Sequence, residues 1–314
     1  MPKILKDFLV YLTTIKGKSM RTRKEYEYDI VLFLRFLKAI ENDIDPTKME
    51  AIDLKDLTID FISEISLEDI YLFLEFCEVQ RGNSAATRAR KAATIKSFFK
   101  YLKGKRRLIE ENVADELETP KIGKKKPIYM NQEDAEVFIN GIKRNNHYYR
   151  NYAMIMFFLN LGLRVSELCS LNINSIQDRL LHVIGKGDKE RTVFLNNVCI
   201  QSLEVYMLKE RKYIQGANTN KALFLSQKGT RLTRQTVAKI VKQINADSGL
   251  NKVKLTPHKL RHTSATIMYK NGADIRSLQH ILGHTSVSTT QIYTHVEDKE
   301  IQQVIENNPF NQLG

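Results

Sequence analysis

The chain has 314 residues, which excludes a peptide or a single small module and suggests two domains of about 150 residues each. It carries 49 Lys and Arg against 36 Asp and Glu, a formal net charge of +13 that favours a polyanionic partner such as nucleic acid. Its longest apolar run, residues 153–159, is far shorter than the roughly 18 residues of a membrane span. We therefore expect no membrane-spanning segment and no membrane partner.

The N-terminus and the cysteines both indicate a cytoplasmic protein. The opening residues MPKILKDFLVYL interrupt their apolar residues with charges and lack a small-residue cleavage site, which argues against a secretory signal. Cys77, Cys169 and Cys199 are widely spaced and form no C-x-x-C pair. We interpret them as buried, reduced thiols.

The first 107 residues show the pattern of helices, with apolar residues three and four positions apart. Ser19 and Ser66 stand where helix caps are expected, and the second of these begins an approximate capping box. Ser84 begins a further helix that Gly104 is expected to stop. These patterns predict an all-α domain of four helices over residues 1–112.

The end of this domain carries the strongest local charge signal in the chain. Residues 81–107 contain ten basic side chains and no acidic one, whereas solvated helix faces usually mix both signs. A weaker basic cluster at 16–24 is equally well explained as a solvated face. Residues 113–127 lose apolar periodicity and hold two Pro, a Gly and four Lys, which predicts a basic linker. The expected nucleic-acid-binding residues are Arg81, Arg88, Arg90, Lys91, Lys96, Lys100, Lys124 and Lys125.

The second half is predicted to be mostly helical with one small sheet, which together form an α+β domain over residues 128–299. Asn131 can cap a helix that runs through Ile142. The segments LLHVI and RTVFL flank the turn GKGDKE and predict a β-hairpin. Other helices are expected at 148–162, 197–213, 234–247, 256–271, 274–282 and 288–295.

Several residues of this half have the chemistry to bind a phosphate. Arg164 follows an apolar helix, and Glu167 stands three residues later, where its carboxylate can hold the guanidinium in one rotamer. Lys186 lies between two glycines on the hairpin turn, where the backbone can approach a ligand closely. Taken singly, these are also what an ordinary surface ion pair and an ordinary turn lysine look like.

Histidines and a tyrosine complete the set. His258 and Arg261 lie three residues apart near a helix start, where the helix dipole attracts an anion. His284 ends a further helix in the segment LGH, and Tyr293 follows nine residues later in IYTH. A single tyrosine in such a helix is more typical of core packing than of catalysis.

A metal site is the alternative interpretation of the histidines. His258 with His262 and His280 with His284 have the i, i+4 spacing of paired metal ligands. The residue after His258 is a lysine and not the glutamate of H-E-x-x-H, and no third ligand stands out. We therefore expect no metal.

Taken together and in order, these residues resemble the active site of the tyrosine recombinases, the phage integrase family. The segments GLRVSEL, GKGDKER, TPHKLRHTSAT, LGH and TTQIYTHV are similar to the family's motifs. The resemblance implies a SAM-like core-binding domain followed by a catalytic domain, and it is greatest to the Xer branch because no arm-binding domain precedes the first helices. The catalytic residues it implies are Arg164, Lys186, His258, Arg261, His284 and Tyr293, with Glu167 in support.

The resemblance also implies a mechanism without metal, ATP or another cofactor. Tyr293 would attack a phosphodiester and form a 3′-phosphotyrosyl bond, with His258 as general base. Lys186 would protonate the leaving 5′ oxygen. Arg164 and Arg261, together with hydrogen bonds from His258 and His284, would stabilise the charge that builds up on the phosphate.

The implied partner is double-stranded DNA with a specific recombination site, bound by a homotetramer or together with a related recombinase. Residues 300–314 predict a short helix with one apolar stripe, which the resemblance suggests docks on a neighbouring subunit; docking on its own catalytic domain is the alternative. The implied function is Xer-type chromosome dimer resolution through a Holliday junction. A mobile-element integrase, a topoisomerase IB-like enzyme and a catalytically silent DNA-binding protein are the alternatives.

Overall fold

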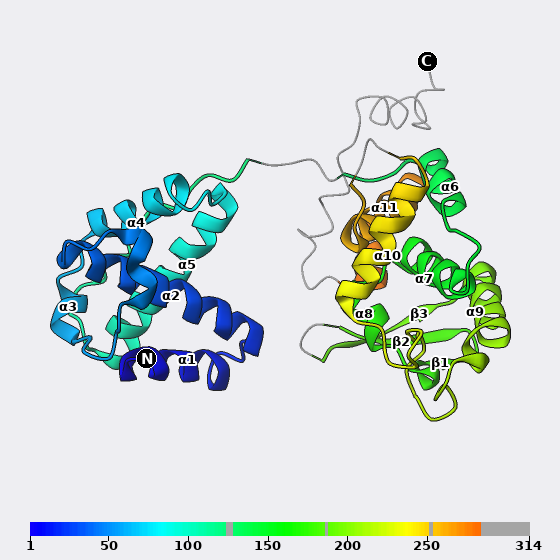
Figure 1. The fold of residues 1–314 in the computed structure, drawn as a ribbon, viewed down its shortest axis with the longest axis horizontal. Coiled ribbons are helices and arrows are strands. Elements are labelled where there is room, and N and C mark those ends of the chain that lie inside the picture. The colour runs from blue at the N-terminus through cyan, green and yellow to red at the C-terminus, as the bar shows by residue number, and fades with distance from the viewer. Residues whose placement is uncertain (124–127, 186–187, 251–253, 284–314) are drawn as a thin grey trace, which may run out of the picture. The chain divides into compact units, whose positions relative to one another are not determined.

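The computed structural model describes residues 1–123, 128–185, 188–250 and 254–283. The chain divides into two compact units, Met1–Lys124 and Lys125–Gly314 (Figure 1). Each unit has a large hydrophobic core of its own. The expectation of a helical unit followed by a mostly helical unit with a small sheet is confirmed.

The regular elements of the first unit are all helices in the part of the chain that is described. Ser19, Ser66 and Ser84 each cap a helix by accepting a backbone hydrogen bond from its first turn, as the sequence predicts. A short helix and a 3₁₀ turn (Pro46–Ala51) add to the four expected helices. The helices are α1 (Lys3–Thr14), α2 (Met20–Glu41), α3 (Ile59–Ser63), α4 (Leu67–Val79) and α5 (Ala85–Tyr101).

Aromatic rings fill the centre of this unit. Phe8, Phe33, Phe73 and Phe98 are fully buried and come from four different helices, α1, α2, α4 and α5. Phe8 packs edge-on against Phe98, and Phe33 packs edge-on against Phe73. Burial of a large apolar side chain contributes about 1.5–3 kcal/mol, so these rings fix how the four helices pack.

Two boundaries of the first unit differ from the sequence-based expectation. Gly104 does not stop the last helix, because α5 continues as a π-helical turn (Leu102–Arg106) that ends at Arg107 with φ +51°. Residues at the start of the expected linker also belong to this unit, since Ala114 and Leu117 are buried in its core. The first unit therefore extends well beyond residue 112.

The second unit surrounds the apolar helix α7 (Tyr148–Leu161), which packs against α9 and α11. Asn131 caps α6, but that helix ends at Asn140, so Ile142 packs from the loop that follows. Residues 288–295 and the tail 300–314 lie outside the described residues. The other helices are α6 (Gln132–Asn140), α8 (Val165–Ser170), α9 (Asn197–Lys209), α10 (Arg234–Asp247), α11 (Pro257–Lys270) and α12 (Ile275–Leu282).

The sheet has three antiparallel strands in the order β1-β2-β3. The expected hairpin is confirmed as β2 (Leu180–Ile184) and β3 (Glu190–Phe194), in register from Leu180 opposite Phe194 to Ile184 opposite Glu190. The short strand β1 (Ile176–Gln177) was not expected from the sequence. Leu181, Val183 and Val193 point into the core, so the hairpin is held to the helices by its inner face.

Candidate functional site

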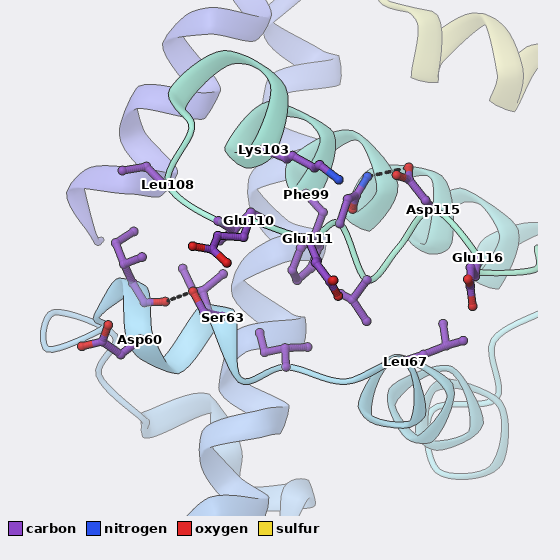
Figure 2. A pocket seen from close by; sticks show the side chains of 16 residues that line it. Asp60, Ser63, Leu67, Phe99, Lys103, Leu108, Glu110, Glu111, Asp115 and Glu116 are labelled. Atoms are coloured by element: carbon purple, nitrogen blue, oxygen red, sulfur yellow. Dashed lines mark hydrogen bonds between the residues drawn. The ribbon is translucent and has the colours of Figure 1, made fainter.

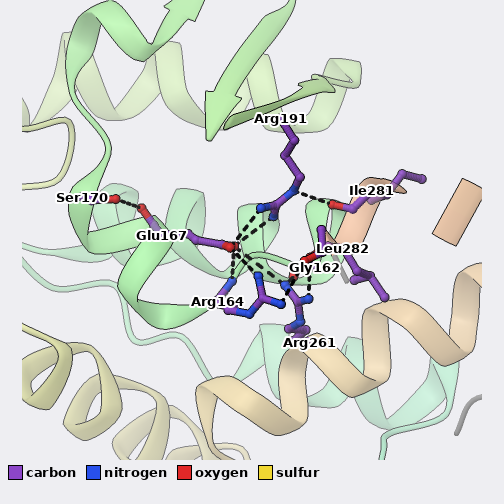
Figure 3. A network of polar contacts seen from close by, with 9 residues as sticks. Gly162, Arg164, Glu167, Ser170, Arg191, Arg261, Ile281 and Leu282 are labelled. Carbon is purple, nitrogen blue, oxygen red and sulfur yellow. Dashed lines mark hydrogen bonds and ion pairs between the residues drawn. The ribbon is translucent and has the colours of Figure 1, made fainter. Parts of the chain in front are cut away.

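A buried carboxylate forms the centre of the candidate site (Figure 3). Glu167 lies in the first turn of α8 and is 2% exposed. Its Oε2 accepts a hydrogen bond from the backbone N–H of Arg164 at 2.8 Å, which caps the helix and fixes the carboxylate relative to the backbone. The interpretation of Arg164 and Glu167 as an ordinary surface pair is therefore wrong, because the carboxylate is in the interior.

Three guanidinium groups surround this carboxylate. Arg164 Nη1 donates to Glu167 Oε1 at 2.7 Å, and Arg191 donates to both carboxylate oxygens at 2.9 Å. Arg261 Nη1 lies 3.7 Å from Oε2. The three arginines come from the loop before α8, from β3 and from α11, so tertiary packing brings together residues from distant parts of the sequence.

The same arginines bind the C-terminal end of α12. Arg191 Nε donates to the carbonyl of Ile281 at 2.9 Å, Arg261 Nη2 to that of Leu282 at 2.6 Å, and Arg164 Nη2 to that of Gly283 at 3.2 Å. These carbonyls have no partner within the helix, and they form the negative end of its dipole. The cations therefore satisfy the last carbonyls of the helix that leads directly to His284.

The exposure of the arginines separates their roles. The side chain of Arg164 is 33% exposed, whereas those of Arg191 and Arg261 are 8% and 3% exposed. Arg261 Nη1 also donates to the carbonyl of Gly162 at 2.6 Å, at the end of α7. Arg164 is thus the arginine of this cluster that is open to a ligand in the structure.

The cluster carries more positive than negative charge. Three arginines oppose one carboxylate and the partial charge of about −0.5 at the helix end, which leaves a local excess of about +1.5. Burial by itself would raise the pKa of Glu167, but hydrogen bonds from Arg191 and Arg164 hold that pKa below its usual range. The carboxylate therefore stays ionised, and the remaining positive charge suits an anionic ligand.

His258 lies in the first turn of α11, next to this cluster. Partial desolvation of the ring, followed by the charges of Arg261 and Arg164, lowers the pKa of His258 below its ordinary value. Desolvation, His258 and Arg261 lower the pKa of His262 to about 4. Both imidazoles are therefore neutral near pH 7, and a neutral imidazole can accept a proton.

The other expected catalytic residues, Lys186, His284 and Tyr293, lie outside the described residues. The metal alternative also finds no support in the part of the chain that is described, where no three His, Cys, Asp or Glu side chains form a metal-binding group. The rings of His258 and His262 pack against each other edge to face, with centroids 4.4 Å apart. Two positive arginine neighbours make this pair a poor place for a cation.

Sequence reasoning missed Arg191. The residue stands at the end of the segment GKGDKER, five positions after Lys186, and nothing in its spacing separates it from the other charges of the hairpin. Its position opposite Val183 in the register turns it toward Glu167. A prediction of the strand register could have identified Arg191 as a site residue.

The basic residues of α5 do not all face the solvent. Lys91 is 2% exposed, and its ammonium donates to the carboxylate of Asp29 at 3.0 Å. Arg90 forms an ion pair with the same buried carboxylate, and Arg88 pairs with Glu78 at 2.6 Å. The run lacks acidic residues in sequence, but α2 and α4 supply them in space. The expectation that Lys91 contacts nucleic acid is therefore corrected to a structural role inside the first unit.

Other members of the predicted nucleic-acid-binding set remain open to solvent. Lys100 is exposed, and Lys96 is partly exposed. Arg81 is also partly exposed and donates to the hydroxyl of Tyr28 at 3.1 Å. Lys124 and Lys125 lie outside the described residues. The solvent-facing part of the predicted surface is thus smaller than the sequence suggests.

An acidic pocket on the first unit is a poor surface for a polyanion (Figure 2). The pocket lies between the segment around α3 and the segment that follows the π-helical turn. Its charged lining consists of five carboxylates and a single lysine, so it disfavours a phosphate backbone. The charged lining residues are Asp60, Glu110, Glu111, Asp115, Glu116 and Lys103.

The three cysteines are free thiols, as expected, but only Cys77 and Cys199 are buried, whereas Cys169 is partly exposed. Burial raises the pKa of Cys77 and of Cys169 to about 11, and that of Cys199 to about 12. Thiols with such values are largely protonated near pH 7 and therefore weak nucleophiles.

No helix in the described part of the chain is long and apolar enough to cross a membrane.

Comparison with known families identifies the chain. Residues 129–300 match the model of the phage integrase family, and residues 5–106 match the N-terminal SAM-like domain of phage integrases. The chain belongs to the phage integrase family, that is, to the tyrosine recombinases. Within the family it is a Xer-type site-specific recombinase, an enzyme that cleaves and rejoins DNA.

Full-length relatives support this placement. The chain is 43% identical over 313 residues to tyrosine recombinase XerC of Caldanaerobacter subterraneus subsp. tengcongensis, covering 99% of this chain and 88% of the relative. It is 35% identical to tyrosine recombinase XerD of Listeria monocytogenes serotype 4b, with 97% of each chain covered. The fold is similar to that of XerH recombinase bound to difH substrate in a pre-cleavage complex, with a TM-score of 0.68, 24% identity and coverage of 96% and 84%.

Proposed function

We propose that this recombinase cuts DNA at a specific double-stranded site through a 3′-phosphotyrosyl intermediate, exchanges strands through a Holliday junction and serves chromosome dimer resolution in the cytoplasm. The observation that carries the proposal is the cluster of three arginines around the buried Glu167, which leaves a fixed excess of positive charge at the end of α12. That charge is available without a metal ion.

The arginines supply the electrostatic part of the reaction. When an oxygen attacks a phosphodiester, negative charge builds up on the non-bridging oxygens. Arg164, the most exposed of the three, offers donors to these oxygens, and Arg261 fixes both the end of α7 and the end of α12 around it. Because Glu167 and the backbone carbonyls hold the guanidinium groups in place beforehand, little reorganisation is needed during the reaction.

The proton transfers fall to residues named by the family pattern. The Tyr293 hydroxyl attacks phosphorus, its proton passes to His258, and a 3′-phosphotyrosyl bond forms as the bond to the 5′ oxygen breaks. Lys186 gives a proton to the leaving 5′ oxygen, and His284 adds a hydrogen bond to the phosphate. The lowered pKa of His258 supports its part, because the neutral ring has a free lone pair near pH 7.

The DNA partner and the assembly are inferred from the family to which the chain belongs. XerH has been observed with difH DNA, and we infer that this chain also binds a specific recombination site. We further infer a working unit of four subunits, which contains either this chain alone or this chain with a related recombinase. Phosphate contacts from Lys96 and Lys100 on α5 and from Lys124 and Lys125 would hold the duplex.

The test is covalent capture on a nicked duplex that carries the sequence the wild-type chain selects from a randomised pool. We expect Tyr293→Phe to abolish the covalent protein–DNA adduct and to leave DNA affinity nearly unchanged, because only the nucleophilic oxygen is removed. Adduct formation by the Phe variant would overturn the assignment of the nucleophile. Strand exchange between two duplexes, measured with wild-type protein, separates recombination from simple nicking and resealing.

A further inference from the structure

Arg191 is one of the two largely buried members of the arginine cluster. Its side chain is 8% exposed, and its planar fork lies against both oxygens of Glu167 while Nε donates to the carbonyl of Ile281. Arg164 approaches the same carboxylate with one side-chain nitrogen and remains far more exposed. Arg191 therefore supports the cluster from behind.

We propose that Arg191 is a positioning residue for DNA cleavage, which holds Glu167 and thereby the phosphate-binding Arg164 in place and which joins the β2–β3 hairpin to the C-terminal end of α12. The inference rests on the proposed phosphate-binding role of Arg164. It assigns to Arg191 no contact with the substrate.

The first step is the effect of Arg191 on Glu167. Each oxygen of Glu167 accepts one hydrogen bond from the Arg191 fork and one from Arg164, either from its guanidinium or from its backbone N–H. A bidentate arginine defines the plane of a carboxylate as well as its position. Without Arg191, the carboxylate can rotate, and the Arg164 guanidinium turns with it. A misplacement of about 1 Å in such a site costs about 100-fold in rate.

The second step is the contact that Arg191 makes between the β2–β3 hairpin and the end of α12. In the sequence, these two segments lead to Lys186 and His284. Arg191 is opposite Val183 in the hairpin ladder, and Lys186 follows the end of β2 by two residues. On the other side, a Cβ added to Gly283 would lie 2.9 Å from Arg191 Nη1, and the glycine has φ +63°. A side chain at this position would therefore strain the backbone and displace the Arg191 guanidinium. The guanidinium therefore fixes the hairpin and the last turn of α12 against each other.

The third step distinguishes positioning from simple packing. Among the residues that the structure describes, the charged groups that face Glu167 are Arg164 from the start of α8, Arg191 from β3 and Arg261 from α11, together with the carbonyl end of α12. Removal of Arg191 takes away one of these cations and two hydrogen bonds. The pKa of Glu167 must then rise, so protonation of Glu167 and loss of its grip on Arg164 occur at a higher pH.

The experiment measures single-turnover adduct formation on the selected nicked duplex with the full-length chain, from about pH 4 to 9, so that the range extends toward the protonation of Glu167 as well as that of His258. We expect Arg191→Met to lower the cleavage rate about 100-fold with little change in Kd for DNA, and to move the acid-side loss of activity to higher pH. Arg191→Lys, which keeps a charge but has no fork, should recover only part of the rate. If Arg191→Met fails to fold, the Lys variant carries the same pH test.

A matched control is Arg231→Met. Arg231 also donates to backbone carbonyls, those of Cys169 and Leu171, but does not contact Glu167, so its loss should leave the cleavage rate and its pH profile unchanged. A double-mutant cycle with Glu167→Gln gives a second readout: Arg191→Met should cost much less in that background, because its partner has already been altered.

The outcomes separate this inference from the proposed function. Arg164→Ala should lower cleavage by several orders of magnitude. If it does so while Arg191→Met cleaves like wild type, the positioning role is wrong and the site assignment stands. If Arg191→Met is slow but keeps the wild-type pH profile and loses the same factor with Glu167→Gln, the residue is merely structural and the inference is also overturned. Normal cleavage by Arg164→Ala would instead overturn the site itself.

Discussion

At the scale of single residues, the candidate site depends on compensation of buried charge. A buried guanidinium or carboxylate without a partner would cost several kcal/mol. Glu167 meets three cations, and each cation also donates to a backbone carbonyl at the end of α12. The carboxylate and the helix end neutralise the three arginines only in part, so positive charge remains in excess. A bound phosphate supplies the missing negative charge, so DNA should stabilise the second unit as well as bind to it.

The histidine pair beside the cluster predicts how folding stability depends on pH. The folded-state pKa of His262, about 4, lies below the value of about 6.5 for an unfolded chain. As pH falls, the unfolded state takes up the proton first, so stability present above about pH 6.5 is lost between about pH 6.5 and 4. We expect a loss of at most about 3 kcal/mol from this group, measured by denaturant unfolding at a series of pH values.

His262→Asn should flatten that part of the stability curve. His258 acts in the same direction, since its pKa is also lowered, so some pH dependence should persist in the variant. The matched control is His280→Asn, whose side chain is exposed on α12 and should leave the curve as it is. A His262→Asn variant with an unchanged curve would show that the imidazole is not kept neutral by its surroundings.

At the scale of elements, α5 combines two faces with different tasks. Its inner face carries Ala92, Ile95 and Phe98 into the core, and the buried carboxylate of Asp29 on α2 binds Lys91 beside them. Lys100 lies on the outer face and is exposed. Like charges along one helix therefore divide into those that hold the unit together and those that remain free to bind phosphate.

This division predicts different results for lysines of the same helix. Replacing Lys96 and Lys100 by Gln should weaken binding to all DNA sequences, and the slope of log K against log salt should fall by about 0.9 for each phosphate that is no longer neutralised. Lys91→Met should leave the slope unchanged and lower the stability of the first unit by about 1–3 kcal/mol, because Asp29 loses a partner. Lys48→Gln, an exposed lysine in the 3₁₀ turn, is the control for binding. If the salt slope is the same for all variants, the DNA does not contact Lys96 and Lys100.

The end of α7 shows how helix termini build the site. Gly162 has φ +58°, its carbonyl accepts from Arg261, and a Cβ there would lie 2.6 Å from the side chain of Leu282. We expect Gly162→Ala to cost about 1–2 kcal/mol for the left-handed backbone and about 1–3 kcal/mol more for the close approach to α12. Thermal unfolding measures the sum, and cleavage should fall because Arg261 shifts.

Gly249→Ala measures the backbone contribution alone. Gly249 has φ +73° but no atom within 4 Å of an added Cβ, so it bears the backbone strain without the clash. The difference between the two variants gives the packing cost at α12. If both lose the same stability and both cleave normally, the close approach of α7 and α12 does not position the arginines.

At the scale of the whole molecule, each of the two units has its own hydrophobic core. One core holds the helical unit, and the other holds the unit that bears Glu167 and its arginines. Residues 300–314 form the C-terminal tail of the chain. That tail carries Ile301, Val304 and Ile305 on one predicted stripe, which is too short for a stable isolated helix and needs a surface to dock on.

We expect deletion after Lys299 to leave the fold of both units and single-site DNA binding intact, and to impair cooperative assembly and coordinated strand exchange. The reason is that docking on a neighbouring subunit would couple the positions of Tyr293 around a tetramer, so that two of four sites cut at a time. Sedimentation on DNA and strand-exchange assays measure the effect. Full assembly and exchange by the truncated chain would refute docking in trans, and loss of folding would favour docking within one chain.

Local patterns in the sequence were sufficient for much of this protein. The caps at Ser19, Ser66, Ser84 and Asn131 were predictable because each is a short-range hydrogen bond between a side chain and the next turn. The hairpin was predictable because alternation and a glycine turn are also local. The order of the arginines and histidines pointed to the family, and the match to the phage integrase family confirmed it.

Tertiary structure decided what each charge does. Lys91 is buried because Asp29, 62 residues away, lies beside it, and Arg191 belongs to the site because the hairpin register turns it toward Glu167 and α12. Sequence patterns report which residues share a strand or a helix face, but a charge takes its role from partners that arrive from other elements. Electrostatic and hydrogen-bond energies depend on the distance and burial of those partners, and only packing of the whole unit sets both.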